Sequence, residues 1–355
     1  MLLDAYRDGG IGVGFRYRTD GNLFNLRRLQ AKTKVNTDTA RDFLFADDCA
    51  LNARTQADMQ ESMDLFAKSC DNFGLTISIK KTEVLHQPAP EAPYTEPDIL
   101  VNGQRLSVAD KFVYLGSTLA RSANIDEEVA YRIARASAAF GRLRERVWER
   151  RGLCLITKLK VYRAVVLPSL LYACETWTVY SRHARQLNSF HMRCLRSLLR
   201  LKWQDKVPDT EVLQRTKSES IHALLLQSQL RWAGHIHRMD DSRLPKRLLY
   251  GELSTGKRPL GRPKKRFKDT LKEALRHCSI PFSSWEVSAE DRSAWRSTVR
   301  SGVAKYEARR RQDKEEKRNQ RKDRSSSSPG PAPAPSIPCP HCNRLFRAKC
   351  NLSEV

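Results

Sequence analysis

The sequence lacks a hydrophobic run long enough to span a bilayer. Its longest nearly unbroken apolar stretch runs from Ala164 to Cys174 and contains Pro168, whereas a membrane-spanning helix needs about 20 apolar residues. The first residues, from Met1 to Asp4, have no basic flank and no long apolar core. We therefore expect neither a membrane partner nor a signal peptide.

Acidic residues are scarce relative to basic ones. The 355 residues include 40 Asp and Glu against 64 Lys and Arg, which gives a formal net charge of +24. Nine scattered cysteines, an odd number, fit a reducing compartment rather than a disulfide framework. The charge predicts a polyanionic partner, most simply nucleic acid, and the basic segments favour the nucleus over the cytoplasm as the intracellular location.

The first third of the chain predicts short strands with one helix. Thr55 is suited to cap that helix and Gly74 to end it. We expect β-hairpins over 12–26 and 43–51, a helix over 55–73, a strand over 75–79, and a strand with a Gly turn over 111–119.

The chain becomes helical after residue 125. An apolar stripe at steps of three and four predicts a long helix, and Arg142, Arg146 and Arg150 form a basic row beside it. The stripe comprises Ile125, Val129, Ile133, Ala136, Phe140, Leu143 and Val147. Further helices are expected over 155–178, 181–201, 219–238, 263–277 and 290–320.

An acidic pair, Asp47-Asp48, lies between two short apolar runs. Asp is common at hairpin ends, so the pair by itself indicates turn chemistry. In this apolar context the two carboxylates also suit a divalent cation, because Mg²⁺ prefers oxygen ligands and keeps waters and substrate phosphates in its shell. Nucleotidyl transfer uses two such ions about 4 Å apart, and the small Ala46 leaves room for a primer end.

Three motifs in order carry a family resemblance. The segment 45–48 (FADD) resembles the aromatic-Ala-Asp-Asp signature of reverse transcriptases, 74–82 (GLTISIKKT) resembles the next palm motif, and 112–116 (FVYLG) resembles the strand that grips the primer. The chain is most similar to non-LTR (LINE-type) retrotransposon reverse transcriptases, whose later region also resembles 231–235 (RWAGH) and 261–267 (GRPKKRF).

The resemblance implies roles for individual residues. Asp47 would be a catalytic Mg²⁺ ligand with Asp48 as its neighbour, and Lys81, or Lys80 beside it, would lie near the incoming triphosphate. The remaining residues implied in substrate binding are Phe45, Ala46, Tyr114, Leu115 and Gly116. The partners implied are RNA and DNA, as a primer–template duplex, with dNTPs as the small-molecule substrates.

The chain departs from the family pattern in two ways. Ser78 stands where many LINE-type sequences have Asn. The family also has a further metal-binding Asp on an earlier palm strand, and the few residues before Asp47 offer no Asp on such a strand. We therefore expect no polymerase activity from this chain alone. The alternative function is a non-catalytic, basic nucleic-acid-binding protein with a degenerate zinc finger.

The segment from 257 to 268 is basic and contains no acidic residue. Its Gly-Arg-Pro core is similar to an AT-hook, although Leu260 replaces the preceding Arg, and a solvated basic loop or a nuclear-localisation signal are the alternatives. The cations expected to contact nucleic acid here are Lys257, Arg258, Arg262, Lys264, Lys265 and Arg266.

Near its end the sequence has half of a zinc-finger pattern. Cys339 and Cys342 have the spacing of an opening ligand pair, but Val355 stands where the first His is expected. The pair is either a Zn²⁺ site or part of a truncated, unfolded remnant.

The expected fold class is α+β, with a truncated reverse-transcriptase palm of antiparallel strands plus a helix, followed by an all-α thumb and a basic helical C-terminal region. The expected boundaries are a partial palm at 1–119, a thumb at 120–200, a basic helical region at 201–280, a charged helix at 281–324, a disordered linker at 325–338 and an incomplete finger at 339–355.

Overall fold

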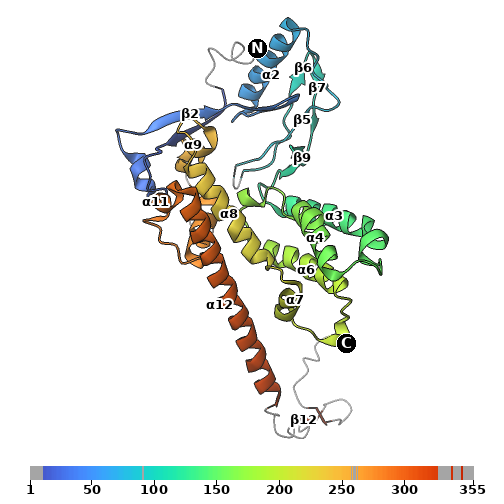
Figure 1. The fold of residues 1–355 in the computed structure, drawn as a ribbon. Helices are drawn as coiled ribbons and strands as arrows, with labels where there is room; N and C mark the ends of the chain where they lie inside the picture. Colours follow the sequence, from blue (N-terminus) through green and yellow to red (C-terminus); the bar gives the residue numbers. More distant parts are fainter. Residues whose placement is uncertain are drawn as a thin grey trace. The chain divides into compact units, whose positions relative to one another are not determined.

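A computed structural model describes residues 11–89, 92–256, 258, 261, 263–326, 337–338 and 345–346. The chain divides into two compact units, Met1–Glu307 and Ala308–Val355. The described residues form many helices and several small, mostly antiparallel sheets, as expected for an α+β protein (Figure 1). No helix in the described ranges is both long and apolar enough to cross a membrane.

The first sheet joins segments from the two ends of the first unit. Strand β1 (Val13–Tyr17) lies between β2 (Asn36–Ala40) and β11 (Gly251–Leu253), and both pairings are antiparallel. A short 3₁₀ helix, η1 (Leu26–Gln30), lies between β1 and β2.

The hairpin expected over 12–26 is therefore wrong in its second strand. The backbone amides of Asn22 and Leu23 donate to the carboxylate of Glu286, at 2.7 and 3.1 Å, and Leu23 is buried in the C-terminal core. This long-range contact removes the segment from strand pairing, and β2 pairs with β1 instead.

The second region contains the acidic pair. Strands β3 (Asp42–Phe45) and β4 (Asp48–Leu51) form the expected hairpin, and α2 (Gln56–Asn72) follows them. The hydroxyl of Thr55 accepts from the Asp58 amide at 3.1 Å, and Gly74 has φ +67° just after the helix, so both predicted helix signals are confirmed.

Small paired strands complete this region. The strand expected over 75–79 is wrong, because this segment pairs with no described strand. Ile77 and Ile79 instead pack on a small core built around Met63, Ile99 and Val101. The pairs are β5 (Glu83–Val84) parallel to β8 (Ser107–Val108), β6 (Leu100–Val101) with β7 (Gln104–Arg105), and β9 (Lys111–Tyr114) with β10 (Ser117–Ala120).

A helical region with its own core follows. All seven residues of the predicted apolar stripe belong to this core. The predicted helix is confirmed as far as Arg142, and Val147 lies in the π-helical turn that follows. The helix expected over 155–178 ends earlier, because Ala173 has φ +58°. The elements are α3 (Asp126–Arg142), a π-helical turn η2 (Arg144–Trp148), α4 (Leu155–Val161), a second π-helical turn η3 (Tyr162–Val166), α5 (Leu167–Leu170), η4 (Cys174–Thr176), α6 (Ser181–Leu198), η5 (Trp203–Asp205) and α7 (Asp209–Thr216).

The next helix connects two cores. Helix α8 (Ile221–His237), yellow in Figure 1, contributes Ile221 and Leu225 to the core around α3 and Leu230 and Ala233 to a second core around Trp285 and Trp295. The other elements of the second core region are α9 (Leu244–Tyr250), α10 (Phe267–His277), α11 (Trp285–Glu290) and the start of α12 (Arg292–Ser326). Helix α12 confirms the long polar helix expected over 290–320.

The second unit contains the remainder of α12 and one small strand pair, β12 (Ile337–Pro338) with β13 (Leu345–Phe346). The predicted Zn²⁺ ligands Cys339 and Cys342 lie outside the described residues, as does most of the predicted linker.

Candidate metal and nucleic-acid site

The acidic pair lies at the tip of a tight hairpin. Phe45 pairs with Asp48, so Ala46 and Asp47 alone form the connection between β3 and β4. Ala46 has φ +52°, a conformation that costs an L-residue free energy, and its small side chain keeps the tip compact. Asp47 and Asp48 are exposed, and so is Phe45, at 62%.

Burial and the carboxylates of this hairpin raise the pKa of the Cys49 thiol. Desolvation raises the pKa of Cys49, and the negative charges of Asp42, Asp48 and Asp47 raise it further. Asp42 lies opposite Leu51, at the other end of the hairpin from the tip, so only Asp47 and Asp48 belong to the predicted site. A cation bound at the tip would be attracted by both.

The hairpin predicted to grip a primer lies beside the acidic hairpin. The Tyr114 hydroxyl donates to the Phe43 carbonyl oxygen at 2.9 Å, which joins β9 to β3. Desolvation raises the pKa of Tyr114, and the charge of Asp48 adds to this effect. The structure thus brings Tyr114 close to the acidic pair, while Leu115 and Gly116, with φ +48° and +79°, form the turn into β10.

Helix α3 holds that turn through residues that the sequence analysis did not identify. Glu128 and Arg132 form an ion pair at 2.7 Å with side chains only 3% and 7% exposed. Glu128 also accepts from the Thr118 amide at 2.7 Å, and Arg132 donates to the Gly116 carbonyl. The i, i+4 spacing of Glu128 and Arg132 was the available signal, but it does not by itself distinguish a buried pair from a surface pair.

Tyr172 completes this arrangement. Its hydroxyl donates to the Leu115 carbonyl at 3.1 Å, and the Arg132 guanidinium lies 4.4 Å from the centre of its ring. The turn at 115–116 is therefore fixed to the helical region by backbone contacts on both of its residues.

The two predicted triphosphate-binding lysines are exposed in a turn of their own. Lys80 and Lys81 are exposed in a turn closed by the amides of Lys81 and Thr82, both bonded to the Ser78 carbonyl at 3.0 Å. In the described part of the chain, no hydrogen bond or ion pair joins either lysine to Asp47 or Asp48.

The predicted basic row is exposed. Arg142 ends α3, Arg146 lies in the π-helical turn and Arg150 follows it, so the three are not on one continuous helix. None of them forms an ion pair within the ranges that the structure describes, whereas the neighbouring Arg144 pairs with Glu149 at 2.6 Å. The three guanidinium groups are available to an external anion.

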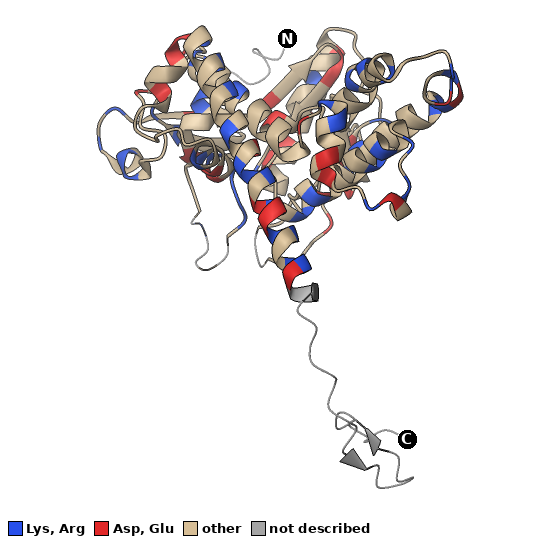
Figure 2. Ribbon diagram, turned by 60° about the horizontal axis from the view of Figure 1, so that its bottom comes forward, with Lys and Arg blue, Asp and Glu red and all other residues tan. Residues whose placement is uncertain are grey.

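The basic segment near 260 is largely engaged within the protein. Lys257 and Arg262 lie outside the described residues. The others have internal partners: Arg258 with Asp269 at 2.7 Å, Lys264 with the Ser122 carbonyl at 2.7 Å, Lys265 with Glu273 at 2.7 Å, and Arg266 with Glu252 at 2.7 Å. Figure 2 shows Lys and Arg distributed over many elements, interspersed with acidic residues.

The acidic hairpin offers two carboxylates at its tip. The described residues contain no cluster of three or more His, Cys, Asp or Glu side chains placed to hold a metal ion. Asp47 and Asp48 can contribute oxygen ligands to one Mg²⁺, which would take its other ligands from water or phosphate.

The chain is similar to two proteins from mobile elements. It is 23% identical over 285 residues to a transposon-derived protein of Caenorhabditis elegans, and the match covers 75% of this chain and 98% of that protein. It is also 23% identical over 174 residues to the RNA-directed DNA polymerase from the mobile element jockey of Drosophila funebris, covering 47% of this chain and 19% of the polymerase. These similarities support a retrotransposon-related protein. No protein-family model and no solved structure matches the chain.

Proposed function

We propose that this chain is a nucleic-acid-binding protein derived from a LINE-type reverse transcriptase. In this proposal residues 1–119 contain part of the palm, 120–200 form the thumb, and the basic helical region follows. The ordered motifs and the similarity to the jockey polymerase support this origin.

The observation that carries the proposal is the position of the acidic pair. Asp47 and Asp48 are exposed at the tip of a hairpin with a two-residue connection, and Tyr114 of the neighbouring hairpin bonds to Phe43 on the same hairpin. Carboxylates at an exposed tip can approach a cation that is bound to the phosphates of a nucleic-acid end, which a buried acidic pair cannot do. Asp47 would be the principal ligand, and Phe45 and Ala46 would lie closest to that end.

We expect the isolated chain to bind nucleic acid without extending a primer. Two-metal nucleotidyl transfer needs carboxylates on both sides of the metal pair, and among the described residues no group of three or more His, Cys, Asp or Glu side chains is placed to hold a metal ion. The test is primer extension on an RNA template with Mg²⁺ and dNTPs, with an active reverse transcriptase as positive control.

Matched variants make this test decisive. Incorporation that is lost in Asp47→Asn but kept in Asp64→Asn, an exposed carboxylate on α2, would overturn the expectation of inactivity. Absence of incorporation by the wild-type chain, at a protein concentration that saturates the primer–template, would agree with it.

Binding is tested by titrating a labelled RNA–DNA duplex between about 50 and 200 mM salt, because each phosphate contact contributes about 0.9 to the slope of log K against log salt. The combined variant Arg142→Gln, Arg146→Gln, Arg150→Gln should reduce the slope by about 2–3. Arg144→Gln is the control, since Arg144 is already paired with Glu149. A wild-type slope near zero would contradict the proposed function.

A further inference from the structure

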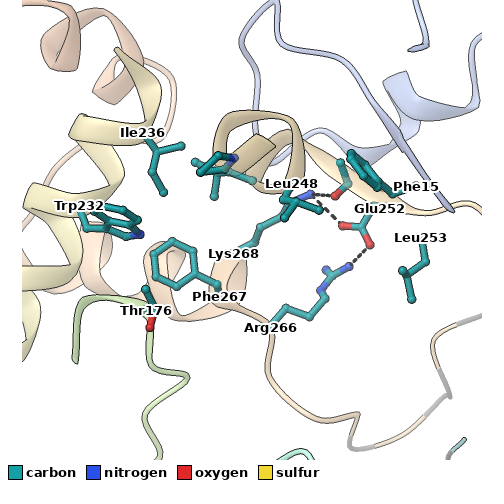
Figure 3. Close-up of a pocket in the computed structure, with 13 residues that line it drawn as sticks. Phe15, Thr176, Trp232, Ile236, Leu248, Glu252, Leu253, Arg266, Phe267 and Lys268 are labelled. Carbon is teal, nitrogen blue, oxygen red and sulfur yellow. Dashed lines mark hydrogen bonds and ion pairs between the residues drawn. The ribbon is translucent and has the colours of Figure 1, made fainter. Parts of the chain in front are cut away.

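A pocket of about 480 Å³ lies within the C-terminal core region, away from the acidic hairpin. Its walls come from α8, α9, β11 and the start of α10, together with Phe15 of β1 and Thr176 of η4 (Figure 3). Ligand pockets in proteins commonly have volumes of about 300–1,000 Å³, so this one is large enough for a small organic group.

One end of the pocket is aromatic. Trp232 of α8 and Phe267 of α10 lie near each other on the same side, with Ile236 above them. Both rings are only partly buried, which leaves ring surface for a ligand. Leu248 and Leu253, 43% and 61% exposed, add apolar surface that remains open to solvent.

The other end carries three charged side chains. Arg266 Nη1 donates to Glu252 Oε2 at 2.7 Å, and Lys268 Nζ donates to Glu252 Oε1 at 2.9 Å and to the Gly251 carbonyl at 2.6 Å. The dashed contacts in Figure 3 show this cluster. Arg266 also lies 3.6 Å from Asp269, which does not line the pocket. Among the lining residues themselves two cations face one carboxylate, and this positive excess favours an anionic ligand.

Arg266 retains an unsatisfied donor. Its Nε atom is buried and has no hydrogen-bond acceptor among the described residues. The Arg266 side chain as a whole is 32% exposed, so its guanidinium, and not the buried Nε, is the part that a ligand oxygen can approach. Lys268, in contrast, has both of its bonds within the protein.

An aromatic wall facing a cationic end suits a planar, apolar group that carries acceptor oxygens. We propose that this pocket binds one unpaired nucleotide of a single-stranded nucleic acid. The base lies against Trp232 and Phe267, and an acceptor oxygen of the nucleotide lies at Arg266. This inference rests on the proposed nucleic-acid binding and adds to it a site that distinguishes unpaired bases from the sugar–phosphate backbone.

The test compares two single-stranded oligonucleotides of equal length and charge, one with all its bases and one with abasic positions. Base stacking on aromatic side chains changes affinity by about fivefold to a hundredfold per base, so the wild-type chain should prefer the intact strand by at least about fivefold. Affinities are measured by fluorescence anisotropy at one salt concentration.

Two variants assign the preference to the pocket. Trp232→Ala removes the stacking surface, and Leu253→Trp fills the open side at an exposed position that tolerates a large side chain. Both should bind the two strands with affinities within about twofold of each other. Trp203→Ala is the control, because Trp203 is 85% exposed in η5 and does not line the pocket.

The outcomes separate the two proposals. Salt-dependent binding with equal affinity for the two strands in the wild-type chain overturns the pocket inference and leaves the proposed function intact. A preference that survives in Leu253→Trp, at an unchanged unfolding temperature, also overturns it. Failure of the wild-type chain to bind either strand contradicts the proposed function itself.

Discussion

Gly234 of α8 lies directly against the indole ring of Trp295 of α12. A Cβ atom at position 234 would overlap Nε1 and Cδ1 of that ring, and Nε1 donates to the Leu230 carbonyl at 2.9 Å. The close approach of these two helices therefore depends on the absence of a side chain at position 234.

We expect Gly234→Ala to lower the free energy of unfolding by about 1–3 kcal/mol, because overpacking outweighs the helix preference of Ala. Gly141→Ala on α3 is the control. No atom lies within 4 Å of its added Cβ, so it should raise stability by about 0.5–1 kcal/mol. Urea unfolding followed by circular dichroism measures both. A stabilising Gly234→Ala would show that the two helices are not in this contact.

Replacing one partner of the buried pair Glu128–Arg132 should lower the free energy of unfolding far more than replacing one partner of a surface pair. Arg132→Met leaves the Glu128 carboxylate buried without its counter-ion, and we expect a loss of about 3–5 kcal/mol in the free energy of unfolding. Lys111→Met is the matched control, since Lys111 and Glu127 are 3.9 Å apart, 67% and 50% exposed, and such pairs contribute less than about 1 kcal/mol. Equal effects of the two substitutions in urea unfolding would contradict the burial of the first pair.

His191 should make the folded state sensitive to acid. Burial lowers its pKa to about 4, and its ring nitrogens lie 2.8 Å from the Tyr162 hydroxyl and 3.2 Å from the Glu219 carbonyl. Between pH 6.5 and 4 the unfolded chain binds a proton here that the folded chain does not, so stability falls as pH falls, by about 3 kcal/mol over that window.

The test is urea unfolding of His191→Gln at pH 7 and pH 4. This variant should be less stable than wild type at pH 7 but should lose less stability on acidification. His235→Gln, at an exposed position on α8, should keep the wild-type pH dependence. Identical pH profiles for wild type and His191→Gln would rule out a depressed His191 pKa.

Ala46, at the acidic tip, has a left-handed backbone conformation that glycine adopts more readily. Ala46→Gly relieves the strain of φ +52°, so we expect a change in unfolding free energy between zero and a gain of about 1 kcal/mol. Ala134→Gly, at an exposed position within α3, should instead cost about 1 kcal/mol. A comparable loss in both variants, measured by thermal unfolding, would indicate an ordinary backbone conformation at Ala46.

Local signals in the sequence predicted local structure well. The Thr55 cap, the glycine after α2 and the apolar stripe of α3 each depend on residues within a few positions, and the structure confirms them. The hairpin over 43–51 was predicted for the same reason, whereas the segment 111–119, predicted as a strand with a Gly turn, forms two paired strands.

Long-range contacts account for the errors. The alternation that predicted a return strand at Leu23 contains no information about Glu286, and only the folded chain shows that this carboxylate binds the segment. The apolar residues Ile77 and Ile79 were assigned to a strand from their spacing, although their burial comes from packing on a core.

The candidate site was predicted only in part. Asp47 and Asp48 were assigned to a hairpin from adjacent residues, and Tyr114 was assigned from a separate motif. Glu128, Arg132 and Tyr172 were missed because their roles depend on the packing of segments that are distant in sequence.

The pairing of β1 with β11 has a consequence for synthesis of the chain. Strand β1 leaves the ribosome before its partner Gly251–Leu253, which is translated only after the helical region. At about 5–20 residues per second, the edge of β1 that β11 will cover stays unpaired for on the order of tens of seconds. During that interval a nascent polypeptide carries an uncovered strand edge, so the completion of this sheet depends on the order in which its segments are made.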